Sequence, residues 1–151
     1  MPHSKIPDSD SKNLKTCIQR ASIFLKYLDS KFSEHFIPGQ NICINESIVK
    51  FKGKISFITY NPMKSTKWDI RIYAMTDSET RYIYTILLYF GSITSKNFIR
   101  PDLPVSTRIL LHLYQKLLNK IPEVQGYYMF TDRYTNIPLR EELMKMKCHL
   151  T

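Results

Sequence analysis

Residues 126–143, with the sequence GYYMFTDRYTNIPLREEL, decide the fold of this chain. The run 127–131 is aromatic and apolar and predicts a short buried strand. Asp132 stands at the end of that strand, and Thr135 or Asn136 can then cap a helix whose first turn contains a proline. The segment therefore predicts a strand that ends at an acidic residue and leads directly into a helix.

Upstream of this segment, the hydrophobic spacing predicts a helix that opens at Ser106 and closes at Pro122. Its apolar face consists of Ile109, Leu110, Leu113, Tyr114, Leu117 and Leu118. A strand that is reached through a helical crossover usually lies parallel to an earlier strand of the same sheet. We therefore expect the Tyr127 strand to return parallel to a strand in the first half of the chain.

The middle of the chain predicts several short strands joined by short turns. These are the β-branched stretch of Ile42, Ile44, Ile48 and Val49, a pair at Ile55 and Phe57, and the runs 69–75 and 82–90. The run 82–90 is almost wholly apolar, so we expect it to be buried on both faces. Asp77 and the three residues after it predict a hairpin connection, with Asp77 as a turn cap.

The first part of the chain predicts a long helix. Apolar residues share one stripe from residue 13 to about residue 32, namely Leu14, Cys17, Ile18, Ala21, Phe24, Leu25, Leu28 and Phe32. Pro38 and Gly39 stop the pattern. We expect residues 1–12 to form a flexible terminus, residues 13–35 a helix, and residues 36–151 the main domain.

The composition excludes several classes of protein. The chain has 151 residues, which is one domain's length, and its three cysteines form no C-x-x-C pair. A disulfide framework and a zinc site made from this chain alone are therefore not expected. Without a signal peptide or a membrane span, we expect a soluble intracellular protein with no membrane partner and no small-molecule cofactor.

The chain is strongly basic, with 22 Lys and Arg against 13 Asp and Glu and a net charge of +9. The excess is central, where a single acid, Asp69, lies among the cations Lys50, Lys52, Lys54, Lys64, Lys67 and Arg71. Lysines at alternate positions of a strand project from one face and can follow phosphates, so DNA is the first partner to consider. The same pattern also fits an ordinary solvated sheet edge.

Several pieces of the sequence resemble piggyBac-type transposases, and they occur in the same order. They are Phe36–Ser47, Phe51–Lys54, Tyr60–Lys64, Lys67–Ile72, Asp77–Tyr82 and Phe130–Leu143. The similarity runs from about Leu28 to Thr151. It implies an α/β fold of the RNase H-like, DDE transposase type, in which helices flank a mixed sheet. The resemblance also implies a C-terminally truncated sheet, with an exposed edge where the last strand would pair and a tendency to self-associate.

The resemblance further implies DNA strand transfer by three carboxylates that hold two divalent ions, Mg²⁺ or Mn²⁺. The family's first Asp falls on Asn45, the second falls on Asp132, and the third belongs to a segment beyond Thr151. An Asn brings no charge to such a cage, so we expect Mg²⁺ or Mn²⁺ not to bind tightly. Glu46 is adjacent, but strand alternation points its side chain to the opposite face from Asn45.

The leading hypothesis is a transposable element-derived fragment that is catalytically inactive alone. Its remaining activity would be DNA or protein binding, in the nucleus by resemblance, with Lys50, Lys52, Lys54, Lys64, Lys67 and Arg71 as DNA contacts. One alternative is an active metal-dependent transposase or nuclease whose remaining segments are missing here. Another is a basic module that binds an acidic protein partner.

Overall fold

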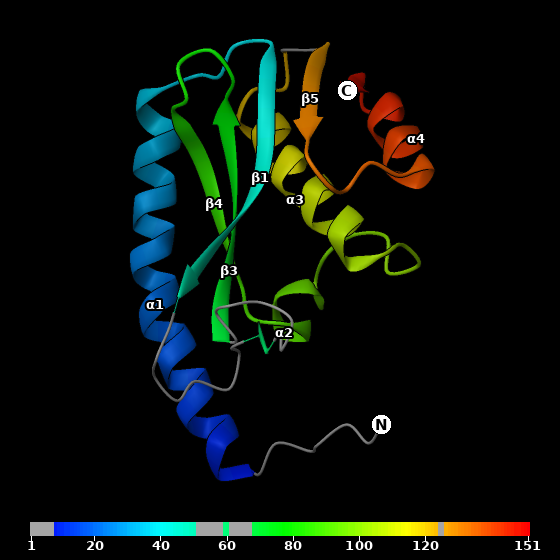
Figure 1. The fold of residues 1–151 in the computed structure, drawn as a ribbon. Coiled ribbons are helices and arrows are strands. Elements are labelled where there is room, and N and C mark those ends of the chain that lie inside the picture. The colour runs from blue at the N-terminus through cyan, green and yellow to red at the C-terminus, as the bar shows by residue number, and fades with distance from the viewer. Residues whose placement is uncertain (1–7, 51–58, 61–67, 124–125) are drawn as a thin grey trace.

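The chain folds into a mixed β-sheet with helices on one face and along one edge (Figure 1). The computed structural model describes residues 8–50, 59–60, 68–123 and 126–151. The strands are β1 (Asn41–Lys50), β2 (Thr59–Tyr60), β3 (Trp68–Asp77), β4 (Ile83–Tyr89), β5 (Tyr127–Thr131) and β6 (Cys148–Leu150). The helices are α1 (Asp8–His35), α2 (Ser92–Ser95), α3 (Val105–Lys120) and α4 (Ile137–Lys145).

The sheet combines an antiparallel half with a parallel half. β3 pairs antiparallel with β1, β2 and β4, and β5 pairs parallel with both β1 and β6. The strands therefore follow the order β2-β3-β1-β5-β6, with β4 also pairing with β3. The predicted mixed sheet is confirmed, as is the return of the Tyr127 strand parallel to an earlier strand.

The core lies between the sheet and α3. Ile42 and Ile44 of β1 and Tyr127 and Met129 of β5 are buried on the same side as the apolar face of α3. The ring of Tyr114 packs edge-on against the ring of Tyr127, with centroids 6.1 Å apart. Each fully buried side chain of this size contributes roughly 1.5–3 kcal/mol relative to an exposed one, so the α3 contact anchors both β1 and β5.

The α4 helix begins as its sequence predicts, because the Asn136 side chain accepts a hydrogen bond of 2.8 Å from the backbone of Leu139.

After this helix the structure contains a strand that the sequence did not predict. Lys147 adopts a left-handed φ of 54°, and the chain then forms β6, which pairs with β5. The edge of β5 is therefore paired rather than exposed, and the strand went unpredicted because three residues are too few to show alternation.

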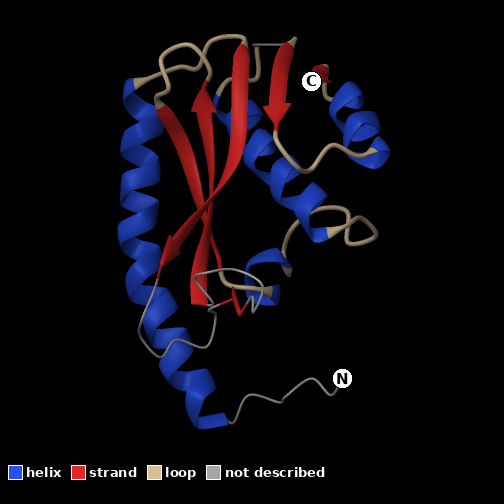
Figure 2. Ribbon diagram, viewed as in Figure 1, coloured by secondary structure: helices blue, strands red, loops and turns tan. Residues whose placement is uncertain are grey.

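The α1 helix runs along the outer edge of β4 (Figures 1 and 2). A carboxylate oxygen of Asp29 accepts hydrogen bonds from the backbone amide of Ile86, at 3.1 Å, and from the Thr85 hydroxyl. Its other oxygen lies 2.6 Å from the Lys116 ammonium of α3. The helix therefore supplies acceptors to a sheet edge that would otherwise expose unpaired amides.

Two sequence predictions about this edge differ from the structure. The helix begins at Asp8 rather than near residue 13, and Phe24, assigned to its buried stripe, is 63% exposed. In β4, Tyr84 and Thr85 are buried, but Ile83 is exposed and the remaining residues are only partly buried. Both differences arise because α1 covers the edge of β4 rather than a whole face of the sheet.

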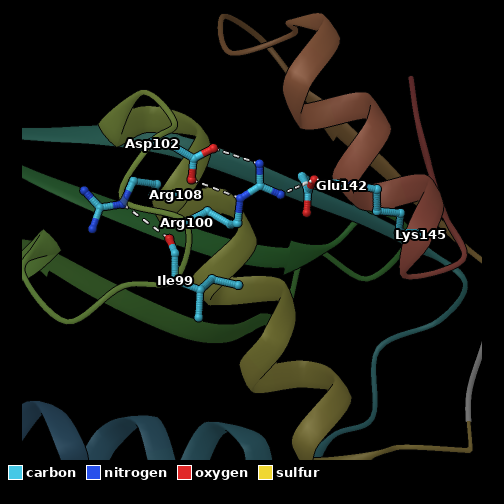
Figure 3. A network of polar contacts seen from close by, with 6 residues as sticks. All are labelled: Ile99, Arg100, Asp102, Arg108, Glu142 and Lys145. Atoms are coloured by element: carbon cyan, nitrogen blue, oxygen red, sulfur yellow. Dashed lines mark hydrogen bonds and ion pairs between the residues drawn. The ribbon is translucent and has the colours of Figure 1, made fainter.

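Two arginines fix the loop between α2 and α3 (Figure 3). The guanidinium group of Arg108 is buried and donates hydrogen bonds to the carbonyls of Ser95, Phe98 and Ile99, at 2.6–3.3 Å. Arg100, with a left-handed φ of 56°, pairs with Asp102 and reaches Glu142 of α4. These contacts hold α4 against the start of α3.

No helix in the described part of the chain is long and apolar enough to cross a membrane.

Candidate functional site

The two residues that the resemblance aligns with catalytic carboxylates lie on neighbouring strands, with Asn45 in the middle of β1 and Asp132 directly after the end of β5. In the parallel ladder between β1 and β5, the last paired residues are Ile44 and Thr131. Asn45 and Asp132 come directly after these two residues. The parallel register of β1 and β5 therefore brings Asn45 and Asp132 close together.

A pocket of about 560 Å³ opens at this point. It forms because β5 ends at Thr131 while β1 continues to Lys50, so none of the described strands lies beside that edge of β1 there. The pocket is lined by Ile44, Asn45, Glu46, Ile48, Asp132, Arg133 and Tyr134. Side chains from both faces of β1 reach it, because it lies against the strand's open edge.

Glu46 is the most strongly held acid of the pocket. Its side chain is 16% exposed and one oxygen lies 3.3 Å from Nε of Arg71 on β3. Its other oxygen accepts a hydrogen bond from the hydroxyl group of Tyr134. Burial raises the pKa of Tyr134, and the bond to Glu46 raises it further. Strand alternation holds as predicted, since Asn45 is exposed and Glu46 shares the face of the buried Ile44, but both residues border the pocket.

Asp132 is almost free in solvent, with a side chain 83% exposed. One of its oxygens lies 3.7 Å from Nε of Arg133, which is itself 75% exposed. An ion pair this open contributes little to stability. The acid at the end of β5 is therefore available to a ligand, and a positive charge lies beside it.

The loop that carries Asp132 is attached at two points. The ring of Tyr134 packs against the ring of Tyr73 on β3, with centroids 6.1 Å apart. At the far end, the Asn136 amide donates to the Thr107 hydroxyl of α3 at 2.9 Å. The loop between β5 and α4 is thus fixed to the sheet and to α3.

The predicted DNA contacts are only partly described. Lys50 is exposed at the end of β1, and Arg71 is partly buried beside Glu46. The remaining four, Lys52, Lys54, Lys64 and Lys67, lie outside the described residues. The predicted alternation of Lys50, Lys52 and Lys54 on one face remains a prediction.

Asp77 serves as the turn cap that its sequence context predicts. It is buried, pairs in register with Ile42, and lies at the opposite end of β1 from the pocket. Its carboxylate accepts hydrogen bonds from the Gly39 amide and from the amide and hydroxyl of Thr80, at 2.7–2.8 Å. Burial alone raises the pKa of this carboxyl, but the hydrogen bonds from Thr80, Gly39 and the Glu79 backbone outweigh it and lower the pKa below its usual value.

Sequence reasoning missed Tyr134 and Arg133 as pocket residues and missed the partners of Glu46. No spacing rule connects Tyr134 with Glu46, which lie 88 positions apart. The available signal was that Arg133 and Tyr134 directly follow Asp132, because residues directly after a strand end line the same edge of the sheet.

Comparison with known proteins places these features in context. The protein family described as Transposase IS4 matches residues 5–151. A solved piggyBac transposase, in a synaptic complex with hairpin DNA, is 22% identical with a TM-score of 0.70. The match covers 99% of this chain and 30% of that chain. A Mos1 transposase paired-end complex with the left transposon end is 15% identical with a TM-score of 0.44, covering 99% and 44%.

The likeness to the piggyBac transposase establishes the fold, an RNase H-like mixed sheet flanked by helices. The fold class and the family that the sequence resembles are both confirmed. The chain spans less than a third of the length of the solved piggyBac transposase.

Proposed function

Because this chain belongs to the Transposase IS4 family, we propose that it is a transposable element-derived DNA-binding domain that does not carry out strand transfer by itself. The observation that carries this proposal is the register of β1 and β5, in which Asn45, in the middle of β1, and Asp132, just after β5, each follow the last paired residues. This register fits the strand geometry expected of the family's site, but the first position offers an amide instead of a carboxylate.

The residues of the pocket do not fit a two-metal cage. Two adjacent divalent cations need several negatively charged oxygens around them. Glu46 already has Arg71 and Tyr134 as partners, and Arg133 lies beside Asp132. Among the described residues there is no group of three or more acidic, His or Cys side chains that could hold a metal ion.

DNA binding is supported by charge and by the position of the cations. The net charge is +9, and the exposed Lys50 and Arg133 lie at the end of β1 and at the pocket. Cations placed this way can contact phosphates without reading sequence. The piggyBac transposase of similar fold was solved with hairpin DNA. We also expect the chain to act in the nucleus. Imaging of the tagged full chain in cells tests this expectation.

The test is the affinity of the chain for a labelled 20-base-pair duplex at several salt concentrations without divalent ions. Phosphate contacts make the logarithm of affinity fall linearly with the logarithm of salt concentration. Lys50→Gln is expected to reduce that slope by about one. Arg81→Gln is the matched control, because Arg81 is an exposed cation in the turn at the other end of the sheet.

Absence of binding, or an affinity that does not change with salt, contradicts the proposal and favours the protein-interaction alternative. An affinity that requires Mg²⁺ or Mn²⁺ contradicts the metal-free part of the proposal and favours the active-transposase alternative. In either case the family assignment stands, because it rests on the comparison with known proteins.

A further inference from the structure

Glu46 and Tyr134 join two parts of the chain that are far apart in sequence. Glu46 lies in β1, and Tyr134 lies in the loop between β5 and α4. Arg71 approaches the same carboxylate from β3. We call these three residues the Glu46 clamp. The clamp connects the central strand, its antiparallel neighbour and the loop that carries Asp132.

We propose that Glu46 is a positioning residue, which through Tyr134 holds the loop after β5 against β1 and so keeps Asp132 beside position 45. This inference rests on the proposed function, because it assigns a role within the same pocket. An acid next to Asn45 would first suggest a replacement metal ligand. The proposal instead assigns Glu46 a positioning role.

The contacts of Glu46 argue against a role as a replacement metal ligand. One of its oxygens lies at Arg71 and the other at the Tyr134 hydroxyl. A cation that approached this carboxylate would have to displace both partners and would lie close to the guanidinium group. Removing one partner of such a pair would also leave a partly buried charge without compensation, which is costly.

Asp132 needs a positioning contact, because its own side chain supplies little. It is 83% exposed, and its ion pair is with the neighbouring Arg133, which moves with the same loop. Tyr134, two residues further on, is tied to β1 by its hydroxyl group and to β3 by its ring. The β1–β5 ladder places Thr131 beside β1, and the Tyr134 contacts hold the loop that carries Asp132 immediately after it.

The test is hydrogen–deuterium exchange of the amides of residues 132–136 in the full chain without DNA. Loss of one hydrogen bond to a charged group accelerates local opening about tenfold. Tyr134→Phe should show this increase, and Glu46→Leu should show at least as much, because it also removes the ion pair with Arg71. The double variant should exchange no faster than Glu46→Leu, because both changes remove the bond between Glu46 and Tyr134. Glu46→Gln retains an acceptor for the tyrosine hydroxyl and should exchange more slowly than Glu46→Leu.

Tyr128→Phe is the matched control, since it removes a hydroxyl from an exposed tyrosine on β5. The amide resonance of Asp132 should shift in Tyr134→Phe and stay in place in the control. Unchanged exchange in Tyr134→Phe overturns the clamp. Equal acceleration across β1, β5 and α3 also overturns it, because a general loss of stability explains that result. DNA affinity is measured separately, so failure of the clamp and failure of DNA binding are distinguishable.

Discussion

Asn45 and Asp132 are neighbours because each directly follows one member of the last residue pair in the parallel β1–β5 ladder. They border the same pocket, together with Glu46 and Arg133. Two neighbouring strands therefore bring these two positions together, while position 45 has no charge. The first prediction concerns what happens when a carboxylate is restored at position 45.

Asn45→Asp is expected not to cleave or join DNA in the presence of Mg²⁺ or Mn²⁺. The substitution adds one carboxylate, but Glu46 stays with Arg71 and Tyr134, so the described residues still offer too few free acids for two metals. Catalytic groups that act as a unit are far from additive. The measurement is a gel assay with end-labelled duplex, with Asn45→Ala as the control. Metal-dependent cleavage by Asn45→Asp alone would falsify this prediction.

Asp77→Asn is expected to flatten the acid dependence of stability. The folded-state pKa of Asp77 is depressed below the ordinary value of 3.8. Its contribution is therefore present above the unfolded-state pKa and is lost as the pH falls through the folded-state pKa. The wild-type free energy of unfolding should fall more steeply below about pH 4 than that of the variant.

Urea unfolding at a series of pH values measures this difference. Glu79→Gln is the control, because Glu79 is an exposed acid of the same turn. At neutral pH, Asp77→Asn should also lower the free energy of unfolding by about 1–3 kcal/mol, since the new amide group faces hydrogen-bond donors. The prediction would be contradicted if the free energy of unfolding fell equally steeply at acidic pH for wild type and for Asp77→Asn.

Arg108→Met is expected to lower the free energy of unfolding by about 3 kcal/mol. The substitution leaves three carbonyls, of Ser95, Phe98 and Ile99, without their buried donor. Chemical denaturation measures the loss, and Arg140→Met on the exposed surface of α4 is the control, with an expected change within about 0.5 kcal/mol. Equal effects of the two substitutions would show that the buried arginine has no special role.

Asp29→Ala is expected to open the outer edge of β4 and promote self-association. The variant removes the acceptor of the Ile86 amide and the ion pair with Lys116. Light scattering after size-exclusion chromatography should show larger species, and the Ile86 amide should exchange faster than in wild type. Glu34→Ala, which removes an exposed pair with Lys31 on the same helix, serves as the control. A variant that stays at the same mass as wild type argues against edge protection by α1.

Much of the fold could be predicted from local patterns. The strand from Tyr127, the Asn136 cap and the helix after Ser106 result from spacing and capping chemistry, which act over a few residues. The β6 strand and the true position of Phe24 could not, because a three-residue strand shows no alternation and a helix's buried side depends on what packs there.

The sequence by itself determined the family resemblance, the position of Asp132 at the end of a strand, and the excess of positive charge. Only the tertiary structure decided that Glu46 has Arg71 and Tyr134 as partners and that Asp29 caps a sheet edge. The physical reason is separation along the chain. Periodicity reports which side chains share a face of one element, whereas these contacts join groups up to 88 positions apart that meet only after the sheet has formed.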